Sequence, residues 1–445
     1  MIATSRLRRN DVIALALVAV LTLVPIPLGS NRPGLWAITD MLIFLVFLVQ
    51  AITRVFDKDE RARFLPADRL LPIGFVAVAV WHSVQLLPLG QLVSDGQSGI
   101  AAFGDTISVV PGQTLLMLLN YLAYGVVFIL AFQIGQRPGR AKRLYEYTGY
   151  MVAAFGLYAL FVLAVQDNAL LGMPRQFYVG DAAGTFVNRN SFASFLGLGL
   201  VINTGLVALA LFGVAREGQR PDLRAAAMHG LLAALLLAAL LATHSRMGLF
   251  SSLFGALLAA TLYAFQSRRG ARLRVGTAVV IAFGFGALAL MYGQGVLERL
   301  GSTQSSLDVR TELYAQVWDL VLLRPMTGFG AGGFEAAFPL VHGLPVSPDL
   351  VWDKAHNTYL TLFAELGLGM GLVAIAIVAW LCRRMFGALG AGILPRLGAA
   401  VGLGATAQLG LHAFVDFSLE IHAVAILYAF LLGLGMAATE ARRFQ

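Results

Sequence analysis

The 445-residue sequence is poor in charged residues and has a single cysteine, Cys382. Only 13% of its residues are Asp, Glu, Lys or Arg, whereas soluble proteins have about a quarter. This composition excludes a soluble enzyme of two or three domains and an intrinsically disordered chain. The lone cysteine excludes a disulfide scaffold. With 58% hydrophobic residues and a mean hydropathy of +0.77, the chain is expected to lie largely in lipid.

Apolar segments recur along the whole chain. A helix needs about 20 apolar residues to cross a hydrocarbon layer of about 30 Å. The segments of this kind lie at residues 11–29, 35–52, 70–89, 114–134, 149–166, 190–214, 226–243, 247–265, 276–294, 356–381, 397–414 and 420–438. The first has no small-residue cleavage site after it, so it is interpreted as a retained helix and not a signal peptide. We therefore predict an all-α, polytopic integral membrane protein with about twelve transmembrane helices and one transmembrane domain, residues 1–445.

Basic residues are distributed unevenly between the loops that join these segments. Of the 32 Lys and Arg residues, 24 fall in alternate loops with a net charge of +15, and the other loops have a net charge of −6. Because cytoplasmic loops carry the excess of basic residues, both termini are predicted to be cytoplasmic. The formal net charge of +8 then reflects topology and contact with anionic membrane lipids. Nucleic acid is not a predicted partner.

One loop on the outer side, residues 295–355, is long enough to have structure of its own. An amphipathic run over residues 307–323 ends at Arg324-Pro325 and predicts a helix on or near the membrane surface. A glycine-rich turn, residues 328–334, follows. It is expected to let the backbone approach a sugar or another helix. We predict that this loop is the periplasmic part of the protein.

Three arginines lie beside predicted helix starts on the outer side, where basic residues are scarce. Arg189 stands between Asn188 and Asn190, either of which can cap a helix. Arg246 follows a short hinge, and Arg310 lies at the start of the amphipathic helix. Helix N-termini attract anions, and guanidinium groups bind phosphate oxygens in pairs. We therefore predict that these arginines bind a diphosphate and that Asn188 and Asn190 are substrate-binding residues.

An alternative interpretation gives these arginines no part in binding. Each arginine could reach the membrane interface and pair with an acid such as Asp181 or Asp308. The diphosphate interpretation is favoured because three arginines occur on the side of the membrane where positive charge is disfavoured.

His356 lies at the start of the next outer helix, close to Tyr359 and Glu365. The helix dipole and nearby arginines are expected to lower the pKa of the imidazole and keep it neutral. We predict that His356 is a general base. Tyr359 is a predicted substrate-binding residue and Glu365 a supporting residue.

His412 and Asp416 lie four residues apart at the outer end of a further span. Such a pair could bind a metal, but it has too few ligands and lacks the H-E-x-x-H pattern. We predict that both residues support the site, and that the protein uses no metal and no cofactor.

The motifs around these residues resemble those of the bacterial O-antigen ligase and O-antigen (exopolysaccharide) polymerase superfamily. The resemblance extends over about residues 180–435 and is carried by Thr185-Phe-x-Asn188-x-Asn190, Ser245-Arg246-x-Gly248, Arg310, Gly328-x-Gly330-x-Gly332-x-Phe334, His356-Asn357-x-Tyr359-Leu360-x4-Glu365 and His412-x3-Asp416-Phe417. The order and spacing of these elements, and their position on the outer side, make the resemblance specific.

This resemblance implies a metal-independent glycosyltransferase of the bacterial inner membrane with a periplasmic active site. The donor would be a glycan on undecaprenyl diphosphate. The acceptor would be lipid A-core for a ligase, or a growing glycan for a polymerase. Arg189, Arg246 and Arg310 would hold the diphosphate leaving group, and His356 would be the base.

The motifs are shared by ligases and polymerases, so both functions stay open, with the ligase ranked first. A protein-directed oligosaccharyltransferase ranks third. A lipid-linked glycan transporter is the alternative from another class. It is disfavoured because the polar residues gather at one face, whereas transporters place ionisable residues near the middle of their spans.

Overall fold

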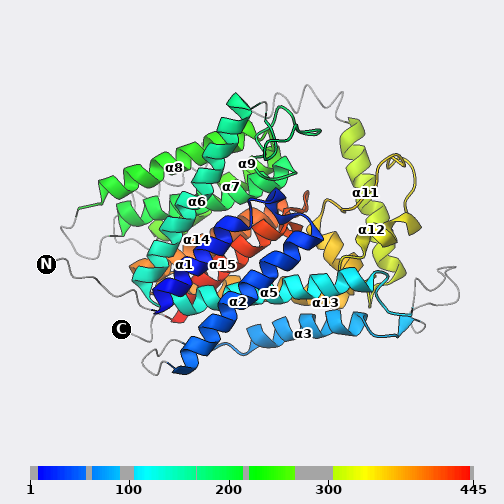
Figure 1. Cartoon of the computed structure of the whole chain (residues 1–445), viewed down its shortest axis with the longest axis horizontal. Coiled ribbons are helices and arrows are strands. Elements are labelled where there is room, and N and C mark those ends of the chain that lie inside the picture. The colour runs from blue at the N-terminus through cyan, green and yellow to red at the C-terminus, as the bar shows by residue number, and fades with distance from the viewer. Residues whose placement is uncertain are drawn as a thin grey trace.

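The computed structural model describes residues 9–56, 63–90, 105–166, 168–213, 220–265 and 304–440. Apart from one isolated β-bridge, the regular secondary structure of these residues is helical (Figure 1). The long helices are α1 (Arg9–Leu23), α2 (Pro33–Phe56), α3 (Leu70–Gln85), α5 (Pro111–Gly135), α6 (Pro138–Val165), α7 (Arg189–Phe212), α8 (Leu223–Ala242), α9 (Arg246–Phe265), α11 (Gln304–Leu323), α13 (Thr358–Ala388), α14 (Ile393–His412) and α15 (His422–Glu440). The short ones are η1 (Leu28–Ser30), α12 (Phe334–Ala337), η2 (Phe338–Leu340) and η3 (Ser418–Glu420).

Eight of the described helices are long and apolar enough to cross a membrane. This confirms an all-α, polytopic membrane protein. Each predicted span within the described residues coincides with a helix, although α1 and α3 are shorter than a typical span. The predicted span at residues 276–294 lies outside the described residues. The total of twelve spans and their orientation in the membrane therefore stay predictions.

Helices α1 to α9 run in alternating directions, as do α13 to α15, so their ends collect at two opposite ends of the bundle (Figure 1). At one end, Asp11 of α1 pairs with Arg140 of α6 at 3.1 Å. Glu440 of α15 pairs there with Arg63 at 3.3 Å. At the other end, a backbone hydrogen bond of 2.9 Å from the N–H of Thr358 to the carbonyl of Ala413 joins the start of α13 to the end of α14. The first end is the one predicted to be cytoplasmic. The predicted site residues lie at the second, which we call the outer end because it is predicted to face the periplasm.

Helix α15 forms the centre of the bundle. Every residue of α15 except Thr439 is buried, and the helix packs against α5, α13 and α14. Glycines allow these close approaches, since a Cβ at Gly433 would overlap the carbonyl oxygen of Phe128 in α5. Gly255 of α9 and Gly404 of α14 face each other in the same way. Small residues at such contacts let transmembrane helices pack closely, and this packing fixes the outer ends of the site helices.

Helix α11 and the glycine-rich turn cover the outer end of α13 (Figure 1). As predicted, α11 ends at Leu323, directly before Arg324-Pro325. Its apolar face packs on the turn and on α12 in a hydrophobic cluster outside the main core. That cluster includes Leu313, Val317, Leu320, Val321, Phe329, Phe334, Ala337 and Phe338. Protein contacts therefore hold this helix in place.

The glycine-rich turn, residues 328–334, docks on a break in α13. The break lies at Gly367, whose φ is +76°. The backbone N–H of Gly330 donates to the carbonyl of Glu365 at 3.0 Å. Gly328 has a positive φ, and a Cβ there would overlap the same carbonyl oxygen. Of the two approaches that the sequence left open for this turn, the structure shows the approach to another helix.

Candidate functional site

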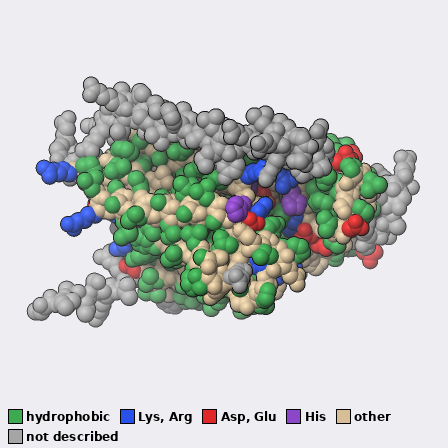
Figure 2. Space-filling model, turned by 90° about the horizontal axis from the view of Figure 1, so that it is seen from above, with side chains coloured by type: hydrophobic (Ala, Val, Ile, Leu, Met, Phe, Trp, Pro, Cys, Tyr) green, Lys and Arg blue, Asp and Glu red, His purple; other side chains and the backbone are tan. Residues whose placement is uncertain are grey.

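The predicted site residues lie at the outer ends of α7, α9, α11, α13 and α14. Histidine, basic and acidic side chains gather on one part of the surface, beside broad areas of hydrophobic side chains (Figure 2). Asp416, after α14, connects two of the helix starts. Its Oδ1 accepts a hydrogen bond from Nδ2 of Asn190 at 3.2 Å, and its backbone carbonyl accepts one from the hydroxyl of Thr358 at 3.3 Å. The starts of α7 and α13 therefore meet at Asp416.

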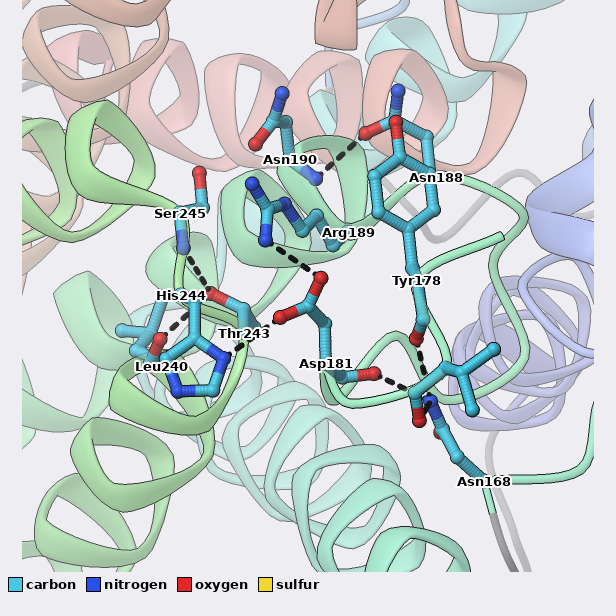
Figure 3. Close-up of polar contacts among 11 residues, drawn as sticks. Asn168, Tyr178, Asp181, Asn188, Arg189, Asn190, Leu240, Thr243, His244 and Ser245 are labelled. Carbon is cyan, nitrogen blue, oxygen red and sulfur yellow. Dashed lines mark hydrogen bonds and ion pairs between the residues drawn. The ribbon is translucent and has the colours of Figure 1, made fainter. Parts of the chain in front are cut away.

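Arg189 is the first residue of α7, and Asn188 is the N-cap. Oδ1 of Asn188 accepts a hydrogen bond from the backbone N–H of Asn190 at 2.7 Å. Nη1 of Arg189 donates to Oδ2 of Asp181 at 2.6 Å (Figure 3), so the ion pair of the alternative interpretation is present. The guanidinium also lies 5.4 Å from the centre of the Tyr178 ring. Its Nε–H is buried and has no partner among the described residues. Arg189 thus keeps donor capacity for a further ligand.

Arg246 is the first residue of α9, and its side chain is exposed. The preceding Ser245 accepts a hydrogen bond from the backbone N–H of Gly248 at 3.3 Å, as an N-cap does. Nδ1 of His244 lies 2.7 Å from Oδ1 of Asp181. Among the residues that the structure describes, none pairs with the guanidinium of Arg246. Asp181 therefore joins the starts of α7 and α9, and Arg246 stands beside this junction with its charge available.

Arg310 is exposed near the start of α11. The pKa shifts of two tyrosines relate Arg310 and Arg189 to Asp416. Burial raises the pKa of Tyr178; the charge of Arg189 opposes this rise and the charge of Asp416 adds to it. Burial likewise raises the pKa of Tyr314; the charge of Arg310 opposes this rise and the charge of Asp416 adds to it. The carboxylate of Asp416 therefore lies within electrostatic reach of both neighbourhoods.

His356 lies within electrostatic reach of the same carboxylate. The hydroxyl of Tyr314 donates to the backbone carbonyl of His356 at 3.0 Å. The imidazole contacts Phe417 edge-on, with ring centroids 5.0 Å apart. Burial lowers the pKa of His356; Asp416 opposes this shift and Arg310 adds to it. Neither ring nitrogen is hydrogen-bonded to a described residue. The imidazole is therefore kept neutral and can accept a proton from a ligand.

The backbone is left-handed at both His356 and His244, with φ values of +52° and +50°. This conformation is uncommon for residues other than glycine, and such residues cluster at functional sites. The surrounding contacts keep both histidines in it, and each one stands directly before a helix start.

His412 links the last turn of α14 to α7. Its Nδ1 lies 2.5 Å from Oγ of Ser194, and both side chains are buried. The hydroxyl of Ser418 donates to Asp416. In the described part of the chain, no three His, Cys, Asp or Glu side chains group as a metal site requires. His412 and Asp416 thus contact the parts of the protein that shape the site, and metal independence stays a prediction.

Tyr359 and Glu365 use their polar atoms within the protein. The hydroxyl of Tyr359 donates to the carbonyl of Gly410 at 2.9 Å and so joins α13 to α14. Oε1 of Glu365 accepts a hydrogen bond from the backbone N–H of Phe334 at 3.3 Å. Glu365 therefore anchors the glycine-rich turn, which fits a supporting role. The hydroxyl of Tyr359 is already used, which weakens its predicted part in substrate binding.

Sequence reasoning missed an ion pair between Lys354 and Glu420, whose Nζ and Oε2 lie 3.2 Å apart. Burial opposes the charge of Lys354, but Glu420 and Glu365 raise its pKa overall. Lys354 lies two residues before His356 in the chain, whereas Glu420 lies after α14. That short separation was the one signal that the sequence offered.

These features define a multi-pass membrane protein whose outer helix ends carry a neutral imidazole and uncommitted guanidinium groups. Residues 231–376 match the family described as O-antigen ligase. The match confirms the resemblance to the O-antigen ligase and polymerase superfamily, whose members are enzymes acting on lipid-linked glycans. The matched segment contains Arg246, Arg310 and His356, whereas Arg189 and Asp416 lie outside it. No curated protein matches the chain.

Proposed function

We propose that the protein is a glycosyltransferase of the O-antigen ligase type. It transfers a glycan from undecaprenyl diphosphate to a hydroxyl of lipid A-core at the periplasmic face of the bacterial inner membrane. The observation that supports this most directly is the environment of His356. Its imidazole is hydrogen-bonded to no described residue and lies within electrostatic reach of Arg310 and Asp416. Asp416 is hydrogen-bonded to Asn190, the residue after Arg189.

The arginines supply the binding site for the donor. Arg246 and Arg310 are exposed and pair with no described residue, and Arg189 has an unsatisfied Nε–H. Arg189 and Arg246 also open helices, where free backbone N–H groups favour an anion. The leaving group of the reaction is undecaprenyl diphosphate, on which negative charge develops in the transition state. Fixed positive groups aimed at that charge lower the barrier, and we propose that they do so without a metal.

His356 acts on the acceptor. The imidazole takes the proton of the acceptor hydroxyl while the hydroxyl oxygen forms a bond to the anomeric carbon of the donor sugar. The bond between that carbon and the diphosphate oxygen breaks, and the electron pair leaves with the diphosphate. A neutral imidazole is needed at the start of this step, and the burial of His356 keeps it neutral.

A two-arm assay tests this proposal. The purified protein is incubated with undecaprenyl-diphosphate-linked glycan, with and without lipid A-core. A glycosylated lipid A-core that depends on His356 supports the ligase. A ladder of longer glycans from donor alone assigns an O-antigen or exopolysaccharide polymerase instead. Movement of the donor across proteoliposomes without transfer assigns a transporter.

A further inference from the structure

His244 and Asp181 form a pair beside Arg189 that has no part in the reaction described above (Figure 3). Nδ1 of His244 lies 2.7 Å from Oδ1 of Asp181, and Nη1 of Arg189 lies 2.6 Å from Oδ2. The two oxygens of one carboxylate therefore serve two different partners. The side chain of Asp181 is 14% exposed, whereas that of His244 is 64% exposed. His244 thus approaches a mostly buried carboxylate from the solvent side.

The hydrogen-bond chemistry fixes the role of each nitrogen. An ionised carboxylate only accepts hydrogen bonds, so Nδ1 of His244 carries the hydrogen. Figure 3 shows the other ring nitrogen pointing away from Arg189. His244 therefore influences Arg189 through Asp181 and not by direct contact.

The local backbone holds this arrangement in place. The backbone N–H of Ala182 donates to the carbonyl of Ala242 at 2.8 Å, which ties the segment of Asp181 to the end of α8. The hydroxyl of Thr243 accepts a hydrogen bond from the backbone N–H of Ser245 at 3.1 Å. These bonds fix the hinge that presents His244, so the geometry of the pair is built into the junction of α8 and α9.

We propose that His244 is a positioning residue that limits the hold of Asp181 on Arg189 to one hydrogen bond. A carboxylate and a guanidinium otherwise favour a fork with two parallel bonds. Because His244 occupies Oδ1, Asp181 engages only Nη1 of Arg189. The second terminal nitrogen points away from Asp181, on the side where Asn190 lies (Figure 3). It offers a hydrogen-bond donor to a phosphate oxygen, and the buried Nε–H beside it has no partner among the described residues.

This inference rests on the proposed binding of the donor diphosphate by Arg189. Without His244, Asp181 is free to turn both oxygens to the guanidinium and to compete with the diphosphate. The effect of His244 on donor binding must therefore depend on the presence of Asp181. A residue that served only to fold the hinge would show no such dependence.

The test measures the affinity of undecaprenyl diphosphate for the full-length protein in nanodiscs. His244→Gly removes the side chain and suits the left-handed backbone, so a loss cannot be assigned to strain. It is expected to weaken binding about tenfold, the scale of one charged hydrogen bond. His244→Asn keeps an N–H near the position of Nδ1 and is expected to bind within about twofold of wild type, because asparagine also tolerates this conformation. His244→Gln, which places its donor at the position of Nε2, is expected to behave like His244→Gly.

The decisive comparison uses Asp181→Asn, which removes the competing charge. This variant is expected to bind undecaprenyl diphosphate at least as tightly as wild type, and adding His244→Gly to it is expected to change nothing further. Equal weakening by His244→Gly in both backgrounds, or no weakening in either, overturns the inference. Arg189→Ala separates the two levels of the proposal. If Arg189→Ala weakens binding while the His244 variants do not, the role of His244 is refuted and the donor site at Arg189 stands. If Arg189→Ala also binds normally, the donor site at Arg189 is refuted as well.

Discussion

Replacing His356 by asparagine removes the proposed base and leaves the fold largely intact. Asparagine tolerates the left-handed backbone at this position, and no described hydrogen bond to the ring is lost. The ring contacts with Trp352 and Phe417 disappear, each of which is worth about 0.5–1.5 kcal/mol. The free energy of unfolding is therefore expected to fall by about 1–3 kcal/mol.

The effect on turnover is expected to be much larger. A positioned general base contributes about 10²–10⁴ to the rate, or about 3–5 kcal/mol of transition-state stabilisation. We expect His356→Asn to lower the turnover number by this factor while the affinity for undecaprenyl diphosphate changes little. The assay is single-turnover transfer from a lipid-linked glycan, with donor binding measured separately.

The pH dependence of turnover gives a second test of His356 as the base. The base acts in its neutral form, and burial lowers the pKa of His356 below its ordinary value, which is about 6.5. Turnover of the wild type is therefore expected to stay constant down to pH 6.5 and to fall only in more acidic buffer. Asp416→Asn removes the charge that opposes this shift, so the acidic limb is expected to move to still lower pH.

His342 offers a matched control on the same outer loop. Its Nε2 lies 3.3 Å from the carbonyl of Val346, and its ring stacks on Phe338. His342→Asn is expected to transfer glycan within about twofold of wild type. If His356→Asn also stays within about threefold of wild type, the assignment of His356 as the base is refuted.

Three further predictions follow from the same geometry. Arg189→Lys and Arg246→Lys keep the charge but lose the fork, so each is expected to raise the Michaelis constant for the donor about tenfold or more; unchanged constants in both would leave only a structural role. Gly328→Ala places a Cβ against the carbonyl of Glu365 at a positive φ. It is therefore expected to lower the free energy of unfolding by about 1–3 kcal/mol, and with it the melting temperature, by disturbing the contact of the glycine-rich turn with α13. Gly343→Ala, where a Cβ meets nothing within 4 Å, is its control. Addition of a chelator is expected to leave turnover unchanged, and strong inhibition would instead indicate a metal.

Much of the fold could be predicted because a lipid environment imposes simple rules on the sequence. A helix across the bilayer needs a long apolar run, so each predicted span in the described residues coincides with a helix. Residues that end helices were equally informative, since α11 ends directly before Arg324-Pro325. The docking of the glycine-rich turn on the break at Gly367 could not be predicted. It depends on contacts between segments that are distant in the sequence, and no short-range pattern encodes such contacts.

For the site too, the residues could be predicted more readily than the contacts between them. Arg189, Arg246, Arg310 and His356 could be singled out because their residue types and their side of the membrane are visible in the sequence. Asp181 was among the acids named as possible partners of the arginines, and the structure shows its ion pair with Arg189. The contacts of His356 could not be predicted, because a hydrogen bond such as the one from Tyr314 to its carbonyl joins residues 42 positions apart. For the same reason, the contact of His244 with Asp181 could not be predicted from the sequence.

The most direct test of the central claim is a cryo-EM structure of the protein with undecaprenyl diphosphate bound. We expect the diphosphate within hydrogen-bond distance of Arg189, Arg246 and Arg310. The imidazole of His356 is expected to face the space beside the diphosphate in which the acceptor hydroxyl would bind. A diphosphate bound elsewhere, or guanidinium groups too far apart to reach one diphosphate together, would contradict the account.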